Sequence, residues 1–322
     1  MKKQTMTLVA VVLMLALVLA GCSGNNGGAD TSNAGNANNA GTNNAGNSNK
    51  GNAGGAAEDK EITLAYVAWD SEIASTNVVR EVLESKLGYT VEMLQVDAGP
   101  MYVGISDGSA DAMVAAWLPS THGENYYEPN KDKFEDLGPN LEGTKTGLVV
   151  PAYMDIASIE DLQGAEVGET VDYTITGIEP GAGIMSATAT AIEAYDLSDW
   201  NLLESSSAAM ATVLKDAYAN EDPVIVTGWT PHWMFAEMDL KYLDDPQEVF
   251  GGEEHINTLV RLGLQDDHPD AYTFLDQFAW EASDMEAVMI DILNGASEEE
   301  AAAKWVEANS DKVDAWLEGI EL

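Results

Sequence analysis

Three tryptophans, Trp69, Trp117 and Trp229, each close a short apolar run and are followed by polar or turn residues. The three runs read LAYVAW, AMVAAW and VIVTGW. An indole face attracts cations, and a quaternary ammonium group, which has no hydrogen-bond donor, suits such a face better than it suits a carboxylate. Core packing is the alternative for each ring taken alone, but the shared position at three run ends favours an aromatic cage for a cation.

The other tryptophans have less distinctive surroundings. Trp233 follows Trp229 closely in GWTPHW, and its role stays open. The rest lie in or beside helical patterns and are predicted to pack in the core: Trp200, Trp280, Trp305 and Trp316.

A glycine-rich turn supplies a candidate site for a negative group. Gly177 and Ile178 end the run DYTITGI, and the helical pattern GAGIMSATATAIEAY begins just after it. Free N–H groups in such a turn, with a helix N-terminus behind them, can bind an anion. His122, five residues past Trp117, is a second candidate because a neutral imidazole donates one hydrogen bond. A plain tight turn and a solvent-facing loop histidine are the alternatives.

The familiar motifs of other chemistries are missing from the sequence. It contains no GxGxxG, Walker lysine, GxSxG or HExxH pattern, and these mark nucleotide binding, serine hydrolysis and zinc proteolysis. The single cysteine excludes CxxC sites, and the other histidines are scattered, so neither a metal nor a cofactor is predicted. A secreted hydrolase that uses some pair of acidic residues remains a remote alternative.

Alternating strand and helix patterns must position these residues. Residues 61–117 read βαβαβ, with a first helix over 75–87 that Ser75 or Thr76 caps. A second βαβ series covers about residues 151–243, and the helical patterns after residue 257 are expected to pack on the first part. In open parallel sheets ligands bind beyond the carboxyl ends of the strands, which is where the tryptophans fall.

The part of the chain after residue 59 is large for a single core, so two lobes are predicted. Residues 60–150 and 250–322 form the predicted lobe 1, and residues 151–249 the predicted lobe 2. The predicted fold class is α/β, with a ligand in the cleft between the lobes.

The N-terminus carries targeting signals. Lys2 and Lys3 precede an apolar stretch that is too short for a comfortable membrane span, and small residues lead to Cys22. Residues 1–21 are therefore predicted to be a lipoprotein signal peptide, with Cys22 acylated. Residues 22–59 are rich in Asn, Gly and Ala and are predicted to be a flexible tether. The protein is expected outside the cytoplasm, lipid-anchored to the outer face of the cell membrane.

The charge of the chain is strongly negative. The sequence has 55 acidic and 14 basic residues, a net charge of −41. Such a chain repels nucleic acid, so nucleic acid is excluded as a partner. A solvated acidic surface suited to a salty or alkaline medium is a hypothesis that this composition raises.

Five segments together carry a resemblance to a known family. They read YVAWDSEIASTNVV, MVAAWLPSTHG, GLVVPAYM, TGIEPGAGIM and VTGWTPHWMF. In these segments the chain closely resembles the glycine betaine-binding lipoproteins of ABC importers for compatible solutes. The resemblance covers essentially all of residues 60–322.

The resemblance implies a two-lobed periplasmic-binding-protein fold of type II and a binding protein that is not an enzyme. It implies a cage of Trp69, Trp117 and Trp229 around the trimethylammonium head of glycine betaine or proline betaine. It implies that the carboxylate is bound by the Gly177 and Ile178 amides and His122. An ABC permease and ATPase complex would receive the solute, for osmoprotection. A protein of the same fold that binds carnitine or choline is the close alternative.

Overall fold

The computed structural model describes residues 60–321. The predicted signal peptide, Cys22 and the predicted tether lie outside the described residues and stay predictions. The described chain opens with β1 (Glu61–Tyr66), α1 (Asp70–Ser85), β2 (Thr90–Gln95), α2 (Ala98–Asp107) and β3 (Ala112–Leu118). Because β1 pairs in parallel with β2 on one side and β3 on the other, the predicted βαβαβ unit is confirmed.

Helix α1 begins five residues earlier than the sequence indicated. It starts at Asp70 with Trp69 as the N-cap, whereas the predicted caps, Ser75 and Thr76, lie inside the helix and are buried. Acidic residues in a first helical turn are favoured by the exposed N–H groups there, and Asp70 and Glu72 occupy this turn. The start was missed because this first turn is polar yet turned toward the protein interior.

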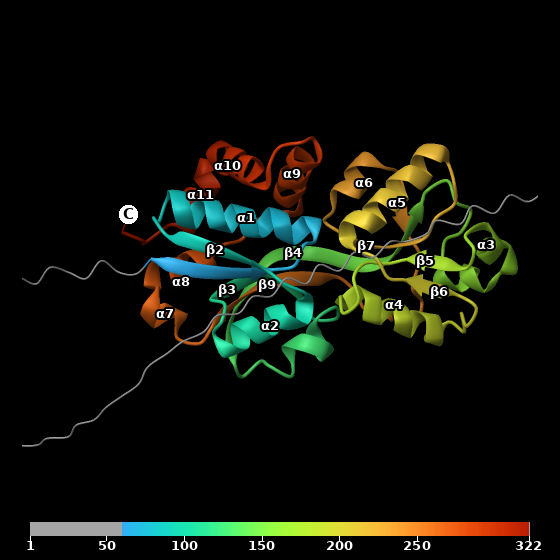
Figure 1. Ribbon diagram of the computed structural model, residues 1–322, viewed down its shortest axis with the longest axis horizontal. Coiled ribbons are helices and arrows are strands. Elements are labelled where there is room, and N and C mark those ends of the chain that lie inside the picture. Colours follow the sequence, from blue (N-terminus) through green and yellow to red (C-terminus); the bar gives the residue numbers. More distant parts are fainter. Residues whose placement is uncertain (1–59, 322) are drawn as a thin grey trace, which may run out of the picture. The chain divides into compact units, whose positions relative to one another are not determined.

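One long strand, β4 (Phe134–Pro151), connects two groups of strands (Figure 1). The remaining strands are β5 (Thr174–Thr176), β6 (Asn201–Leu203), β7 (Val226–Thr230), β8 (Leu240–Tyr242) and β9 (Glu254–Arg261). The strand order is β2-β1-β3-β9-β4-β7-β5-β6, with β8 also on β4. Strand β4 pairs antiparallel with β9 as far as Thr144 and with β7 from Lys145 onward.

We call the group β2-β1-β3-β9 and its helices lobe 1, and the group β7-β5-β6 with β8 and its helices lobe 2. The partner of β4 changes inside an unbroken strand, so no loop or glycine-rich linker marks this point. The residue limits predicted for the two lobes, 60–150 with 250–322 and 151–249, stay a prediction.

Helices flank both groups of strands. They are η1 (Gly123–Tyr127), η2 (Ile159–Gln163), α3 (Ala165–Thr170), α4 (Gly183–Ala194), α5 (Ser207–Asn220), α6 (Trp233–Glu237), α7 (Leu264–Asp267), α8 (Pro269–Gln277), α9 (Ala282–Leu293), α10 (Glu298–Ala308) and α11 (Ser310–Trp316). Helices α9 and α10 contact α1 (Figure 1), so the C-terminal helices return to lobe 1 as predicted. Within residues 60–321 no helix has the length and apolarity that crossing a membrane requires.

The C-terminal helices enclose an aromatic cluster that we call the C-terminal cluster: Phe274, Phe278, Trp280, Trp305 and Trp316. Trp200 packs edge-on against Tyr173 in lobe 2. The four tryptophans that the sequence assigned to packing therefore do pack in the core, and each is no more than 8% exposed.

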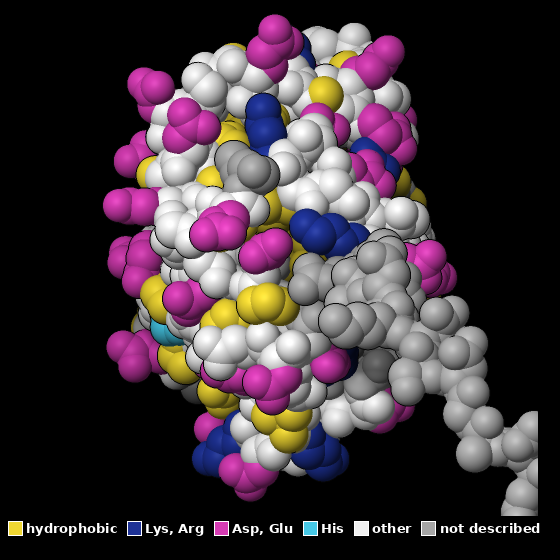
Figure 2. All heavy atoms as spheres, turned by 90° about the vertical axis from the view of Figure 1, so that its left-hand side faces the viewer, with side chains coloured by type: hydrophobic (Ala, Val, Ile, Leu, Met, Phe, Trp, Pro, Cys, Tyr) yellow, Lys and Arg dark blue, Asp and Glu magenta, His cyan; other side chains and the backbone are white. Residues whose placement is uncertain are grey.

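The surface carries the acidity of the sequence. Figure 2 shows Asp and Glu side chains distributed over one face, interspersed with a few Lys and Arg. This face has many single charges rather than one acidic block, which fits a solvated surface.

Candidate functional site

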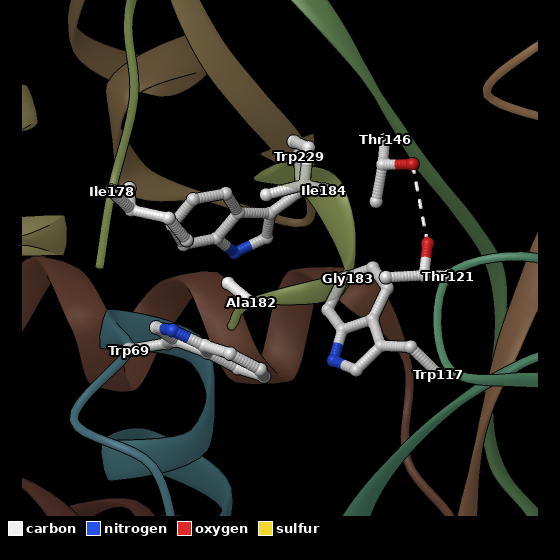
Figure 3. Close-up of a pocket in the computed structure, with 9 residues that line it drawn as sticks. All are labelled: Trp69, Trp117, Thr121, Thr146, Ile178, Ala182, Gly183, Ile184 and Trp229. Carbon is white, nitrogen blue, oxygen red and sulfur yellow. Dashed lines mark hydrogen bonds between the residues drawn. The ribbon is translucent and has the colours of Figure 1, made fainter. Parts of the chain in front are cut away.

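Trp69, Trp117 and Trp229, which we call the cage tryptophans, line one cavity. Trp69 is the N-cap of α1, Trp117 lies near the end of β3, and Trp229 near the end of β7. The other lining residues are Thr121, Thr146, Ile178, Ala182, Gly183 and Ile184. Figure 3 shows the three indole rings around a common space, so the fold brings together the residues that the sequence grouped by run-end position.

Strand β4 holds the two strand-borne tryptophans in register. Trp229 lies opposite Thr146 of β4, and Trp117 lies opposite Ile256 of β9, the other neighbour of β4. The Thr121 hydroxyl, in the turn after β3, lies 3.3 Å from the Thr146 hydroxyl (Figure 3). Thr121 and Thr146 both line the cavity. The part of β4 where its partner changes therefore lies beside the cavity, where residues of both lobes meet.

The indole N–H of every cage tryptophan is bound by a side-chain oxygen. Trp117 Nε1 donates to Glu72 Oε1 at 2.6 Å, and Trp229 Nε1 donates to Ser71 Oγ at 3.0 Å. Trp69 Nε1 donates to Glu179 of lobe 2. Because the polar edge of each ring is satisfied by the protein, the cavity receives the apolar faces, which are the parts that attract cations.

Asp70 connects α1 to lobe 2. Its carboxylate accepts hydrogen bonds from Trp233 Nε1 at 2.8 Å and Ser207 Oγ at 3.0 Å, and it lies 3.6 Å from His232 Nε2. Burial alone would raise the pKa of Asp70, but the nearby His232 and the hydrogen bonds from Trp233 and Ser207 lower it to about 2. Trp233, whose role the sequence left open, therefore lies outside the cavity and binds the two lobes together.

Glu72 is wholly buried behind the cage. Burial raises the pKa of Glu72 to about 7, although hydrogen bonds from Ser71 and Trp117 act in the opposite direction. A carboxylate with this pKa is partly ionised at neutral pH.

The Gly177–Ile178 turn reaches the cavity through Ile178. Among the described residues the Ile178 N–H donates only to the Met185 sulfur, at 3.2 Å, and a thioether is a weak acceptor. The Gly177 N–H donates to Leu203 O at 2.9 Å, so strand pairing already uses it. A Cβ on residue 177 would lie 2.3 Å from Met185 Sδ, so glycine permits a close approach here. Helix α4 begins beside the turn, with Gly183 lining the cavity.

His122 is buried just outside the cavity lining. Its Nδ1 accepts the Trp117 backbone N–H at 3.2 Å, and its ring lies 5.7 Å from that of Trp69. Burial lowers the pKa of His122 to about 3, so the ring is neutral at pH 7. With Nδ1 accepting, the proton resides on Nε2, which has no hydrogen-bond partner among residues 60–321. A buried, unpaired N–H donor adjoins the cage.

The sequence did not predict three acidic residues of the site: Glu72, Glu179 and Glu254. Glu254, 1% exposed, accepts the backbone N–H groups of Ser120 and Thr121, both at 2.7 Å, and so fixes the turn that follows Trp117. The position of Glu72, three residues after a run-end tryptophan, was the one available signal. Among the described residues no group of His, Cys, Asp and Glu could hold a metal ion.

Comparison with known proteins decides the family. The OpuAC family, described as the substrate binding domain of ABC-type glycine betaine transport systems, matches residues 60–308. The chain belongs to the OpuAC family. The resemblance seen in the five sequence segments is thereby confirmed.

A named relative of this OpuAC-family chain is the glycine betaine/carnitine transport binding protein GbuC of Listeria monocytogenes serotype 1/2a (strain 10403S). It is 52% identical over 158 residues, which are 48% of this chain and 53% of GbuC. The match thus spans about half the length of that relative.

Two solved structures resemble the fold across the described residues. Lactococcal OpuAC, in a closed conformation complexed with glycine betaine, is 45% identical with a TM-score of 0.76, covering 81% of this chain and 100% of that one. An ABC-transporter choline-binding protein in complex with choline is 28% identical with a TM-score of 0.75, covering 81% and 93%. The predicted α/β binding-protein fold is confirmed.

Proposed function

We propose that this protein is an extracytoplasmic solute-binding protein that captures glycine betaine, and proline betaine as well, and delivers it to an ABC importer for osmoprotection. The observation that carries the proposal is the single cavity whose walls are the three cage tryptophans, with their N–H edges bound elsewhere. Membership of the OpuAC family and the likeness to lactococcal OpuAC support the ligand class.

The cation end of the ligand lies in the cage. A trimethylammonium group fits between indole faces because it needs no hydrogen-bond acceptor, and each desolvated contact contributes roughly 1–2 kcal/mol. Trp69 and Trp117 come from lobe 1 and Trp229 from lobe 2, so a bound cation joins the lobes. This arrangement favours closure around the ligand.

The carboxylate end lies at the Gly177 turn. The Ile178 N–H has only a weak sulfur acceptor, and the His122 Nε2–H has no acceptor among the described residues. A carboxylate that accepts from both would satisfy two buried donors. This stabilises the complex more than an exposed hydrogen bond would, because an exposed donor is already bound to water in the free protein. Gly177 contributes by its missing side chain, which lets Met185 pack closely against the turn.

No chemistry is done on the ligand in this proposal, and no cofactor or metal takes part. An ABC permease and ATPase receive the solute from the closed form. A lipid on Cys22, a residue outside the described part, would keep the protein at the outer face of the membrane.

Choline and carnitine are the competing ligands. The choline-bound relative supports the first, and the name of GbuC supports the second. Choline has the same cationic head but no carboxylate, so it would leave the Ile178 and His122 donors unpaired. Carnitine has a carboxylate on a longer chain that also carries a hydroxyl group, so chain length and this hydroxyl separate it from betaine.

A titration series tests the proposal. Isothermal titration of glycine betaine, proline betaine, carnitine and choline against the wild type and His122→Ala should give the tightest binding to a betaine. Loss of a hydrogen bond to a charged group predicts about a tenfold or greater drop for betaine in His122→Ala, with choline little changed. His255→Ala, at a half-buried position near the start of β9, is the matched control. Tightest binding of choline, with no effect of His122→Ala on any ligand, would refute the proposal.

A further inference from the structure

Glu72 holds two of the three cage tryptophans from behind. Its Oε1 accepts the Trp117 indole N–H at 2.6 Å, and its Oε2 accepts the hydroxyl of Ser71. That same Ser71 oxygen accepts the Trp229 indole N–H at 3.0 Å. One carboxylate on α1 thus fixes the polar edges of a lobe 1 ring and, through one hydroxyl, a lobe 2 ring.

This carboxylate has no cationic partner. Within residues 60–321, no Lys or Arg forms an ion pair with Glu72. A wholly buried carboxylate without a counter-charge is costly unless something compensates it. A cation in the cavity, which the Trp117 ring lines, would supply such a charge.

We propose that Glu72 is the specificity-determining counter-charge of the cage, which makes the cavity select a positively charged head over a neutral head of the same shape. This inference rests on the proposed function and assigns the charge selection to one residue. Glu72 is a positioning residue, since it acts on the ligand through the two indoles that it holds.

The physical basis is twofold. A negative charge at the N–H edge pushes electron density toward the ring face, which strengthens the attraction of that face for a cation. The charge also attracts the cation directly, and in a buried site this attraction is weakly screened. A neutral head of equal size gains only the contact area.

The other charged groups around the cage are already engaged. Asp70 is bound by Trp233, Ser207 and His232, and Glu179 is only partly buried, so solvent screens it. The low pKa of Asp70, about 2, and of His122, about 3, keeps both groups in one state near pH 7. The pKa of Glu72 is about 7, so Glu72 changes its charge near neutral pH. His232, 4.8 Å from the Trp229 ring, is another ionisable side chain beside the cage, and it is the same in the wild type and in Glu72→Gln.

The test compares two probes that differ in one atom. Glycine betaine carries a trimethylammonium head, and tert-butylacetate carries the same head with carbon in place of nitrogen, and the same carboxylate. In Glu72→Gln, which keeps the shape and one acceptor oxygen but replaces the other oxygen with an NH2 donor, betaine affinity should fall about tenfold while tert-butylacetate affinity stays level or rises. Asp284→Asn, which removes a buried carboxylate that caps α9 away from the cage, should leave both unchanged.

The pH dependence of binding to the wild type is a second test, and it needs no variant. Between pH 6 and pH 8.5 its betaine affinity should rise severalfold as Glu72 ionises, and its tert-butylacetate affinity should fall. Equal losses for both probes in Glu72→Gln, or a pH profile that is flat for both probes, would overturn this inference and leave the proposed function intact. A wild type that binds no betaine would overturn both.

Discussion

The protein contains two groups of buried tryptophans, and they use the same side chain in opposite ways. In the C-terminal cluster the rings pack on each other: Trp305 stacks on Trp316 at 5.7 Å and 13°, and Trp280 meets Trp305 edge-on at 5.6 Å. The cage tryptophans make no such ring contact with one another within residues 60–321. Trp69 and Trp229 instead lie beside histidines, with His122 5.7 Å from Trp69 and His232 4.8 Å from Trp229.

The difference lies in what binds the indole N–H. In the C-terminal cluster, Trp316 donates to the backbone oxygen of Ala279, and Trp280 Nε1 has no partner among the described residues. Each cage tryptophan instead donates to a side-chain oxygen of a Glu or Ser. Rings held at their edges by other elements do not need to stack, so their faces remain free for a ligand.

Removing a ring of the C-terminal cluster should have the largest effect, on stability alone. Trp305→Ala deletes a ring that is 6% exposed, and the resulting cavity should lower the free energy of unfolding by about 3–5 kcal/mol. Urea denaturation measures this loss. Betaine affinity of the folded variant should match the wild type. A comparable loss of affinity would mean that the two groups are not independent.

Removing a cage ring should act mainly on binding. Trp117→Ala should weaken betaine binding by about 2 kcal/mol, a factor of about 30, as measured by calorimetric titration. Trp117→Phe keeps an aromatic face but loses the N–H that Glu72 binds, so its affinity should lie between those of the alanine variant and the wild type. Betaine binding in Trp117→Ala that equals the wild type would exclude Trp117 from the cage.

The sequence predicted the parts of this site that depend on local pattern. Apolar runs marked the strands that carry Trp117 and Trp229, and turn residues marked their ends. The start of α1 was predicted wrongly because its first turn, which holds Asp70 and Glu72, lacks apolar residues at helical spacing. Glu72 itself was missed because little in the sequence distinguishes it among 55 acidic residues.

Long-range pairing was the other feature that the sequence could not supply. The sequence suggested a free Gly177 N–H. In the structure β5 pairs with β6, and just beyond β5 the Gly177 N–H donates to Leu203 O. The change of partner along β4 likewise depends on β9, which arrives more than a hundred residues later in the chain. Such contacts are fixed by tertiary structure, whereas patterns of apolar and turn residues in a sequence extend across only one element at a time.

The smallest predicted effect is on the pH dependence of stability, which should distinguish the cage tryptophans from the C-terminal cluster. The folded pKa of His122, about 3, lies below its ordinary value of 6.5, so its contribution to stability is present above pH 6.5 and is lost as the pH falls. The folded pKa of Glu72, about 7, lies above its ordinary value of 4.5, so its contribution is present below pH 4.5 and is lost as the pH rises. Between pH 4.5 and 6.5 the two contributions have opposite slopes and offset each other.

Glu72→Gln removes one of the two opposing slopes. Relative to the wild type, its free energy of unfolding should therefore rise with pH between 4.5 and 6.5, by about 1 kcal/mol per pH unit, in urea denaturation at several pH values. Trp305→Ala should differ from the wild type by an amount that does not change with pH, because its ring contacts are with tryptophans. The difference between variants cancels the titration of the many surface carboxylates. If the free energy of unfolding of both variants changes with pH as that of the wild type does, Glu72 does not titrate in this range. The hydrogen bonds of Glu72 would then distinguish the cage from the C-terminal cluster without any effect of charge on stability.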